Sequence, residues 1–216
     1  MFYKRSVPKL KKFQNKKPVI AIDGTAASGK GTLSRQIAKI LRFDHLDTGL
    51  LYRYVAYKRI RGEEDEDLDY KKLVSLDLTT EKITKMSSEV AQETRTRHKL
   101  LNFQRSFADN PPSGKGSVID GRDIGTVVIP MAEVRFYVDA KLEVRAQRRL
   151  LDYTRKGIVV EYEEVLKTLE ERDKRDKNRK NSPLTAHNKA ILIDTTNKTL
   201  SECLNFVLKH SKALSK

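Results

Sequence analysis

A glycine-rich segment at residues 24–32 constrains the fold of this chain more than any other feature. It reads G-T-A-A-S-G-K-G-T, follows the apolar run at residues 19–22, and precedes a helical stretch. A strand, such a loop and a helix together form the P-loop, in which backbone N–H groups and the helix N-terminus bind phosphate while a lysine reaches the outer phosphates. Gly24, Gly29 and Lys30 fit this pattern, so the sequence predicts a nucleotide site on an α/β fold.

The loop departs from the general pattern at one position. The residue after Lys30 is Gly31, so the hydroxyl that would face a magnesium ion has to come from Thr32, one place later. A glycine-rich turn with a solvated lysine is the alternative, and the strand before the loop and the helix after it argue against that alternative. The letters S-G-K-G recur at residues 113–116, but prolines precede them and a strand follows, so we interpret this second copy as a surface loop.

Composition limits the class of protein. A chain of 216 residues is long enough for one large core, and no run approaches the ~18 apolar residues of a membrane span, so we expect one soluble domain. The single cysteine, Cys203, excludes an internal disulfide; it lies between Leu200 and Leu204, which indicates a buried apolar residue in a reducing compartment. The four histidines lie far apart, so the sequence gives little support for a zinc site.

The net charge of +15 by itself suggests a nucleic-acid partner, but much of that charge is local. Residues 1–17 hold seven lysines and arginines and no acidic residue, whereas the rest of the chain is only moderately basic. We expect residues 1–17 to be a disordered basic leader and residues 18–216 to be a single domain. Nucleic acid is then not an expected partner, except through weak contacts of the leader.

Five short apolar runs are separated by helical stretches, which predicts a parallel sheet with helices on both faces. The predicted strands are residues 19–22, 43–46, 117–119, 134–138 and 190–193. Ligands of such folds bind at the carboxyl ends of the strands. An aspartate follows each predicted strand: Asp23, Asp47, Asp120, Asp139 and Asp194. The acidic cluster within residues 63–69 lacks the glycine of a calcium loop, and we interpret it as a solvated turn.

Three longer motifs occur in the same chain: L-D-T-G-L-L-Y-R at residues 46–53, D-G-R-D-I-G-T-V-V at residues 120–128, and E-R-D-K-R-D-K-N-R at residues 171–179. Together with the G-K-G-T end of the glycine-rich loop, they resemble the motifs of bacterial cytidylate (CMP) kinases, in the nucleoside monophosphate kinase superfamily. The resemblance runs from about Pro18 to the C-terminus. It implies an α/β, three-layer P-loop kinase fold with a five-stranded parallel sheet and helices on both faces. A helical acceptor-nucleotide lobe would lie at about residues 48–108, and a lid at about residues 155–182.

The resemblance also implies a reaction and its residues. The ATP γ-phosphoryl group would be transferred to CMP, and to dCMP, by a monomeric cytoplasmic enzyme of pyrimidine metabolism that uses Mg²⁺ with ATP. ATP would be bound by Gly24, Thr25, Ala26, Ala27, Ser28, Gly29, Lys30, Gly31 and Thr32, with Thr32 facing Mg²⁺ through nucleotide and water. CMP would be bound by Thr48, Arg53, Ser88, Arg97, Arg122, Asp123, Arg172, Asp176 and Arg179. The residues implied to act in catalysis are Lys30, Arg122, Arg172, Arg175 and Arg179, with Arg175 in the lid over the transferring group.

The chemistry of the motifs fits that reaction. Transfer between two nucleotides requires two phosphate groups held in line and their charge neutralised, and it needs no general base because the acceptor phosphate is already ionised. Helical spacing puts Arg172 and Arg179 on one face with either Arg175 or Asp176, and guanidinium groups suit phosphate oxygens. Taken alone, this segment is also compatible with a solvated charged helix.

The base-recognising residues are supplied by the resemblance. Cytosine offers an exocyclic amine from which the Asp123 carboxylate can accept, and two acceptors to which Arg97 and Ser88 can donate. Without the family, Ser88 would pass as a helix-start serine and Arg97 as a surface arginine. Asp120 could support a magnesium-bound water or be a structural carboxylate.

The chain departs from the family in one segment, and two other functions stay open. Many bacterial CMP kinases carry a small inserted sheet, whereas only 34 residues separate Arg53 from Ser88 here, with helical patterning, so the strictness of base selection is open. One alternative function is a nucleoside monophosphate kinase acting on UMP or AMP. The other is a P-loop ATPase or GTPase that binds RNA through its basic surface. The absence of an aromatic-glycine RNA motif and the aspartates between the arginines of residues 172–179 argue against this second alternative.

Overall fold

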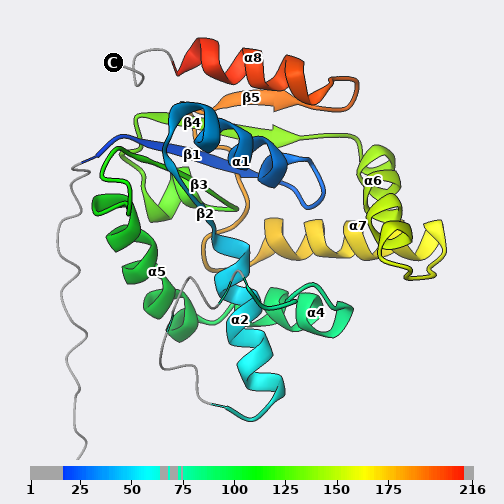
Figure 1. The fold of residues 1–216 in the computed structure, drawn as a ribbon. Coiled ribbons are helices and arrows are strands. Elements are labelled where there is room, and N and C mark those ends of the chain that lie inside the picture. Colours follow the sequence, from blue (N-terminus) through cyan, green and yellow to red (C-terminus); the bar gives the residue numbers. More distant parts are fainter. Residues whose placement is uncertain (1–16, 64–67, 69–72, 74, 212–216) are drawn as a thin grey trace, which may run out of the picture.

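The computed structural model describes residues 17–63, 68, 73 and 75–211, and Figure 1 shows them arranged in three layers. A central sheet has α1 (Lys30–Leu41) and α8 (Leu200–His210) on one face and α5 (Thr94–Asp109) on the other. Residues 1–16 of the predicted leader and most of the acidic cluster lie outside the described residues. No helix in the described part of the chain is long and apolar enough to cross a membrane.

The sheet consists of five parallel strands in the order β2-β3-β1-β4-β5. Their bounds are β1 Val19–Gly24, β2 Asp44–Asp47, β3 Ser117–Gly121, β4 Val134–Asp139 and β5 Ile191–Asp194. The five predicted strands are confirmed, with ends displaced by one or two residues. The chain leaves β1 toward β2 and β3 and then crosses to β4 and β5, so the order reverses beside β1, where α/β folds bind ligands.

The remaining helices flank the sheet. They are α2 (Thr48–Ile60), α4 (Glu81–Val90), α6 (Leu142–Arg155), α7 (Tyr162–Asn178) and a short π-helical turn, η1 (Ile124–Val128). In Figure 1, α2, α4 and α7 lie below the sheet and α6 lies to its right. α2 packs against α4, and α6 packs against α7. The described residues between Arg53 and Ser88 contain no strand, as the helical patterning predicts.

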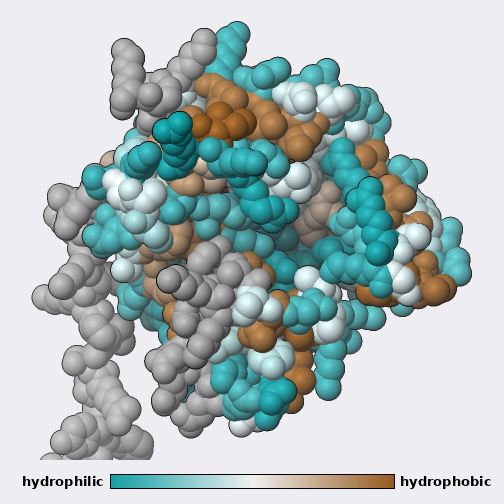
Figure 2. Space-filling view, viewed as in Figure 1, coloured by the Kyte–Doolittle hydropathy of each residue, from teal (hydrophilic) through white to brown (hydrophobic). Residues whose placement is uncertain are grey.

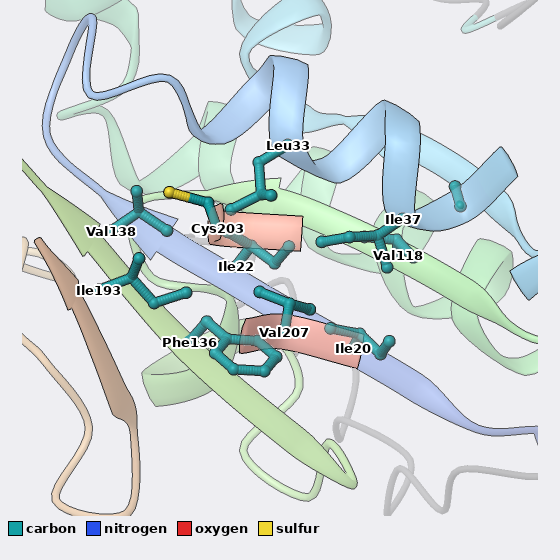
Figure 3. Packing of buried hydrophobic residues seen from close by; sticks show 11 residues of the cluster. Ile20, Ile22, Leu33, Ile37, Val118, Phe136, Val138, Ile193, Cys203 and Val207 are labelled. Atoms are coloured by element: carbon teal, nitrogen blue, oxygen red, sulfur yellow. The ribbon is translucent and has the colours of Figure 1, made fainter. Parts of the chain in front are cut away.

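The core explains why β1 has no polar face. Ile20 and Ile22 point toward α1 and α8, where they meet Leu33 and Val207, and Figure 3 shows Cys203 in this same layer. The side chains of Val19 and Ala21 point to the opposite face of the sheet and pack toward α5 and η1. Cys203 is 3% exposed, and burial raises the pKa of its thiol, so the predicted role as an apolar packing residue is confirmed.

The second S-G-K-G segment is a surface loop, as predicted. Its residues 113–115 are exposed, and Gly114 takes a φ of 69° in a turn. The Ser113 backbone N–H donates to the Asp44 carboxylate over 2.7 Å. This segment runs into β3 and not into a helix, so it has no helix N-terminus with which to bind phosphate.

Candidate active site

The glycine-rich loop has the backbone geometry of a phosphate loop. β1 ends at Gly24, whose φ of 151° is rarely adopted by residues with side chains. A Cβ at this position would stand 1.9 Å from the carbonyl oxygen of Val138, so only glycine lets the loop begin this close to β4. Gly29, with a φ of 87°, precedes α1, which starts at Lys30. Because the first N–H groups of a helix have no intrahelical partner, this end of α1 suits an anion.

Side chains from the far end of the chain hold this loop in place. Arg145 of α6 donates to the carbonyl of Ala26 over 3.2 Å and pairs with Asp173 of α7 at 2.7 Å. The Thr195 hydroxyl, just after β5, donates to the carbonyl of Ser28 over 2.9 Å. Sequence reasoning missed Arg145 and Thr195, because they lie 119 and 167 residues from their partners and belong to no motif.

Lys30 is the charged group of the loop. Its ammonium donates to the carbonyl of Thr25 over 3.3 Å. Burial lowers the pKa of Lys30 to about 7, and the positive charges of Arg122 and Arg172 add to this effect. Three cations brought this close repel one another, and a bound polyanion would relieve that repulsion.

A polar cleft of about 220 Å³ opens between the phosphate loop, the starts of α2 and η1, α4 and α7. The predicted residues that line it are Ala26, Ala27, Lys30, Gly31, Thr48, Arg53, Ser88, Arg122, Asp123, Arg172, Asp176 and Arg179. Tyr52 and Arg149 also line it and were not predicted. Tyr52 is part of the L-D-T-G-L-L-Y-R motif, which could have drawn attention to it, whereas Arg149 belongs to no recognised pattern.

Asp123 is the most constrained acid of the cleft. It is 4% exposed, one carboxylate oxygen pairs with Arg97, and the other lies 3.5 Å from Nη2 of Arg179. Arg97 does not line the cleft; it also donates to the carbonyl of Ala91 over 3.1 Å and stacks over the ring of Tyr52 at 5.8 Å. The structure therefore brings Asp123, Arg97 and Arg179 together from three segments that are distant in sequence.

Ser88 and Thr48 differ in their free hydrogen-bonding capacity. The Thr48 hydroxyl donates to the carbonyl of Asp120 over 2.8 Å, which fixes the start of α2 against the end of β3. The Ser88 hydroxyl is buried and has no hydrogen-bond partner among the described residues. An unpaired buried hydroxyl is unfavourable, so a ligand with a matching polar group would stabilise this side of the cleft.

Three arginines approach the cleft from different elements. Arg122 donates to Asp176 of α7 over 2.9 Å, and Arg53 donates to the carbonyl of Gly49 over 3.1 Å. Burial alone would raise the pKa of Asp176, but the charges of Arg122 and Arg172 hold it below its usual range. Burial and the neighbouring Arg122 lower the pKa of Arg172 to about 10, and its Nε has no partner among the described residues. Arg122 is paired with Asp176 and Arg53 with Asp47, but basic side chains outnumber acidic ones in the cleft lining, which favours a phosphate ligand.

Seven predicted residues do not line the cleft: Gly24, Thr25, Ser28 and Gly29 of the loop, and Thr32, Arg97 and Arg175. Thr32 is exposed on the first turn of α1, and its hydroxyl accepts from Arg35 over 3.5 Å. Arg175 lines a neighbouring groove of about 290 Å³ between α4 and the α6–α7 pair. Ile158 and Val159, between α6 and α7, line the same groove, and Val159 is 95% exposed. Figure 2 shows hydrophobic side chains at the surface near the end of this pair of helices.

Known proteins resemble this chain along most of its length. The sequence model of the family described as "Cytidylate kinase" matches residues 20–76 and 64–213. A cytidylate kinase of Paramagnetospirillum magneticum is 46% identical over 189 residues, which span 82% of this chain and 90% of the relative. One of Rhodospirillum rubrum is 44% identical over 202 residues, or 88% of this chain and 95% of the relative. A solved gluconokinase of Sinorhizobium meliloti 1021 covers 94% of this chain and 95% of its own, with a TM-score of 0.51 at 14% identity, and shows the fold alone.

Proposed function

The chain belongs to the cytidylate kinase family and is an enzyme that phosphorylates CMP with ATP, and we propose that the 220 Å³ cleft is where the transfer takes place. The observation that carries the proposal is the convergence of the phosphate-loop lysine, Lys30, with Arg122 and Arg172 on one cleft that also contains Asp123. A donor phosphate loop and an acceptor-binding wall within the same small cleft fit an in-line transfer.

In the proposed mechanism the protein positions the two phosphate groups and neutralises their charge, and it supplies no general base. The phosphate loop and the start of α1 bind the ATP phosphates through backbone N–H groups, with Lys30 at the outer ones. Arg53, Arg122 and Arg179 bind the CMP phosphate, and Arg172 donates with its unpaired Nε as charge spreads over the migrating group. Arg175 reaches the reacting groups only if α7 moves toward the phosphate loop, because it lines the neighbouring groove.

The base is selected on the opposite wall of the cleft. Asp123 accepts from the exocyclic amine of cytosine, and the Ser88 hydroxyl donates to a ring acceptor. Asp176 and Arg172 of α7 line the cleft and are proposed to face the ribose. dCMP is proposed as a second substrate on the resemblance to the family.

Magnesium is proposed to enter with ATP. The described residues hold no group of three acidic, histidine or cysteine side chains that could bind a metal alone, which fits an ion held mainly by nucleotide phosphates. Asp47 and Asp120 line the cleft near Lys30 and could hold the water ligands of the magnesium ion. His45 bonds Asp120 at 2.7 Å. Thr32 would reach this ion only through water. Bound there, Mg²⁺ would neutralise charge on the ATP phosphates.

We also propose a monomer that acts in the cytoplasm, where both nucleotides are present.

The test is a comparison of Arg172→Lys with Arg95→Lys in a coupled assay of ADP release. Arg172→Lys keeps the charge but loses the planar donor fork, so kcat/KM for CMP should fall on the order of 10²-fold. Arg95 is exposed on α5, away from the cleft, and Arg95→Lys should match wild type. Equal kinetics of the two variants would show that transfer does not take place in this cleft.

A further inference from the structure

Asp23 is a buried acid that belongs to neither substrate-binding wall. It is the last residue of β1 before Gly24, it is 5% exposed, and it does not line the cleft. Its two carboxylate oxygens accept from two consecutive backbone N–H groups, Ile124 at 2.7 Å and Gly125 at 2.8 Å. A buried carboxylate with both oxygens committed to one turn is a strong geometric constraint on that turn.

The turn held by Asp23 carries the acceptor-binding residues. Ile124 and Gly125 open η1, and the N–H groups of a first helical turn have no partner within the helix. The residue before them is Asp123, whose carbonyl accepts from the backbone N–H of Val127 and of Val128 at 2.9 and 3.0 Å. The two bonds that Asp23 makes therefore hold the backbone directly after Asp123, whose side chain is itself paired with Arg97 and Arg179.

The residue after Asp23 is Gly24, which begins the phosphate loop beside β4. Gly24 is paired with Val138 of β4 in the sheet, and a side chain at Gly24 would collide with the Val138 carbonyl, so the loop begins close against β4. Asp23 is also the parallel-sheet partner of Gly121, which precedes Arg122. One side chain thus joins the first residue of the ATP loop to the segment that faces CMP.

We propose that Asp23 is a positioning residue that sets the Arg122–Asp123 segment relative to the phosphate loop, and so aligns the CMP phosphate with the ATP γ-phosphate. The inference rests on the proposed function of the cleft. Asp23 contacts neither nucleotide; it acts through Ile124, Gly125 and the residue before them. A displacement of ~1 Å in such an alignment costs on the order of 10² in rate.

The variant Asp23→Asn tests the proposal with a conservative change of shape. The amide keeps one acceptor and turns its NH₂ group toward a backbone N–H, so one of the two bonds is lost. We expect kcat/KM for CMP to fall about 10- to 100-fold and the CMP over UMP ratio of kcat/KM to narrow. The dissociation constant of ATP, measured calorimetrically without CMP, should stay within about twofold of wild type, because the phosphate loop keeps its own supports.

Asp139→Asn is the matched control at the end of the adjacent strand. Asp139 accepts from the Thr25 hydroxyl at 2.6 Å and from the backbone N–H of Ala140 at 2.8 Å, so it supports the ATP loop and not η1. Both bonds go to the same oxygen, Oδ1, which the amide keeps, so this variant loses only the negative charge. It should weaken ATP binding modestly and leave the CMP over UMP ratio unchanged. The double variant Asp23→Asn with Asp123→Asn should have the same CMP over UMP ratio as Asp123→Asn alone, because Asp23 acts on that ratio through the Asp123 side chain.

If Asp23→Asn weakens ATP binding as much as it lowers kcat/KM for CMP, and the CMP over UMP ratio of kcat/KM is unchanged, the inference is overturned. Asp23 would then be a stabilising residue only. Wild type with no CMP kinase activity would instead contradict the proposed function, so the two failures are distinguishable.

If Asp23→Asn does not fold, the wild-type pH profile gives the same test. Burial raises the pKa of Asp23 to about 7, against the lowering effect of its two N–H donors. The charged or titratable groups near it are Asp123, Arg122, Tyr137 and Arg135. The CMP over UMP ratio should fall as pH drops from about 8 to about 6, since a protonated Asp23 loses one acceptor. The phosphates of CMP and UMP titrate alike and cancel in the ratio. A flat ratio across the pH range in which an NMR titration shows the Asp23 carboxyl to protonate would overturn the inference.

Discussion

Asp123→Asn should change the choice of base more than it changes the use of ATP. In the structure the Asp123 carboxylate is buried and held by Arg97 and Arg179, so it can only accept, which suits the cytosine amine and opposes the uracil carbonyl. An amide in the same place can donate to that carbonyl. A mispaired buried group costs ~1 to 3 kcal/mol, and ~1.4 kcal/mol corresponds to a factor of ten, so the CMP over UMP ratio of kcat/KM should narrow roughly 10- to 100-fold.

The assay is steady-state kinetics with CMP and with UMP at saturating ATP, and Asp176→Asn is the control. Asp176 is also a buried cleft acid paired with an arginine, Arg122, but it lies on α7 and not on the wall assigned to the base. Asp176→Asn should lower kcat/KM for both acceptors by a similar factor. An unchanged ratio in Asp123→Asn would mean that Asp123 orients Arg97 and Arg179 without contacting the base, and the specificity argument would be refuted.

Three further predictions concern the charge, the hydroxyl and the metal of the site. Lys30→Met should reduce turnover 10³-fold or more, and a folded variant within tenfold of wild type would contradict the role of this lysine. The pKa of Lys30 is lowered from 10.5 to about 7, so its charge destabilises the folded free enzyme fully below pH 7 and less as pH rises toward 10.5. Lys30→Met should therefore melt at a higher temperature than wild type at pH 7, which scanning calorimetry can check. Ser88→Ala should raise KM for CMP about 5- to 10-fold without lowering the melting temperature, since its hydroxyl has no partner in the described part of the free enzyme; unchanged kinetics would remove Ser88 from the site. Excess chelator should abolish turnover, restored by Mg²⁺, and should leave the melting temperature without nucleotide unchanged; a lower melting temperature would reveal a metal site within the protein itself.

The sheet and the phosphate loop were predictable because their signals are local. β1 is an unbroken apolar run followed at once by Gly24 and Gly29, whose positive φ values only glycine adopts readily. The burial of Cys203 also follows from its neighbours in sequence. Strand ends were displaced by one or two residues, because hydrogen bonding at the edge of an apolar run depends on the neighbouring strand.

The site was predictable where a motif names its residues, and Ser88 and Arg97, which lie in none of the quoted motifs, came from the family resemblance. Arg122, Asp123 and Arg179 were found through the motifs, and the structure shows that they meet in one cleft. Arg145 and Thr195 support the phosphate loop across more than a hundred residues, and no local pattern announces such contacts.

Helical spacing also could not decide between Arg175 and Asp176. Both satisfy the period from Arg172, but α7 presents Asp176 to the cleft and Arg175 to the groove beside α4. Which of two adjacent residues faces a partner depends on the rotation of the helix, and tertiary packing sets that rotation.

The most direct test of the account is the rate of ADP release from ATP with CMP, dCMP, UMP and AMP as alternative acceptors, each over a full concentration range. The account predicts the highest kcat/KM for CMP, substantial activity with dCMP, a value at least about tenfold lower for UMP, and little activity with AMP, which lacks the pyrimidine amine and carbonyl arrangement. A preference for UMP or AMP over CMP would contradict the assignment of Asp123 and Ser88 as the base-reading wall, and ATP hydrolysis without any acceptor dependence would contradict the transfer itself.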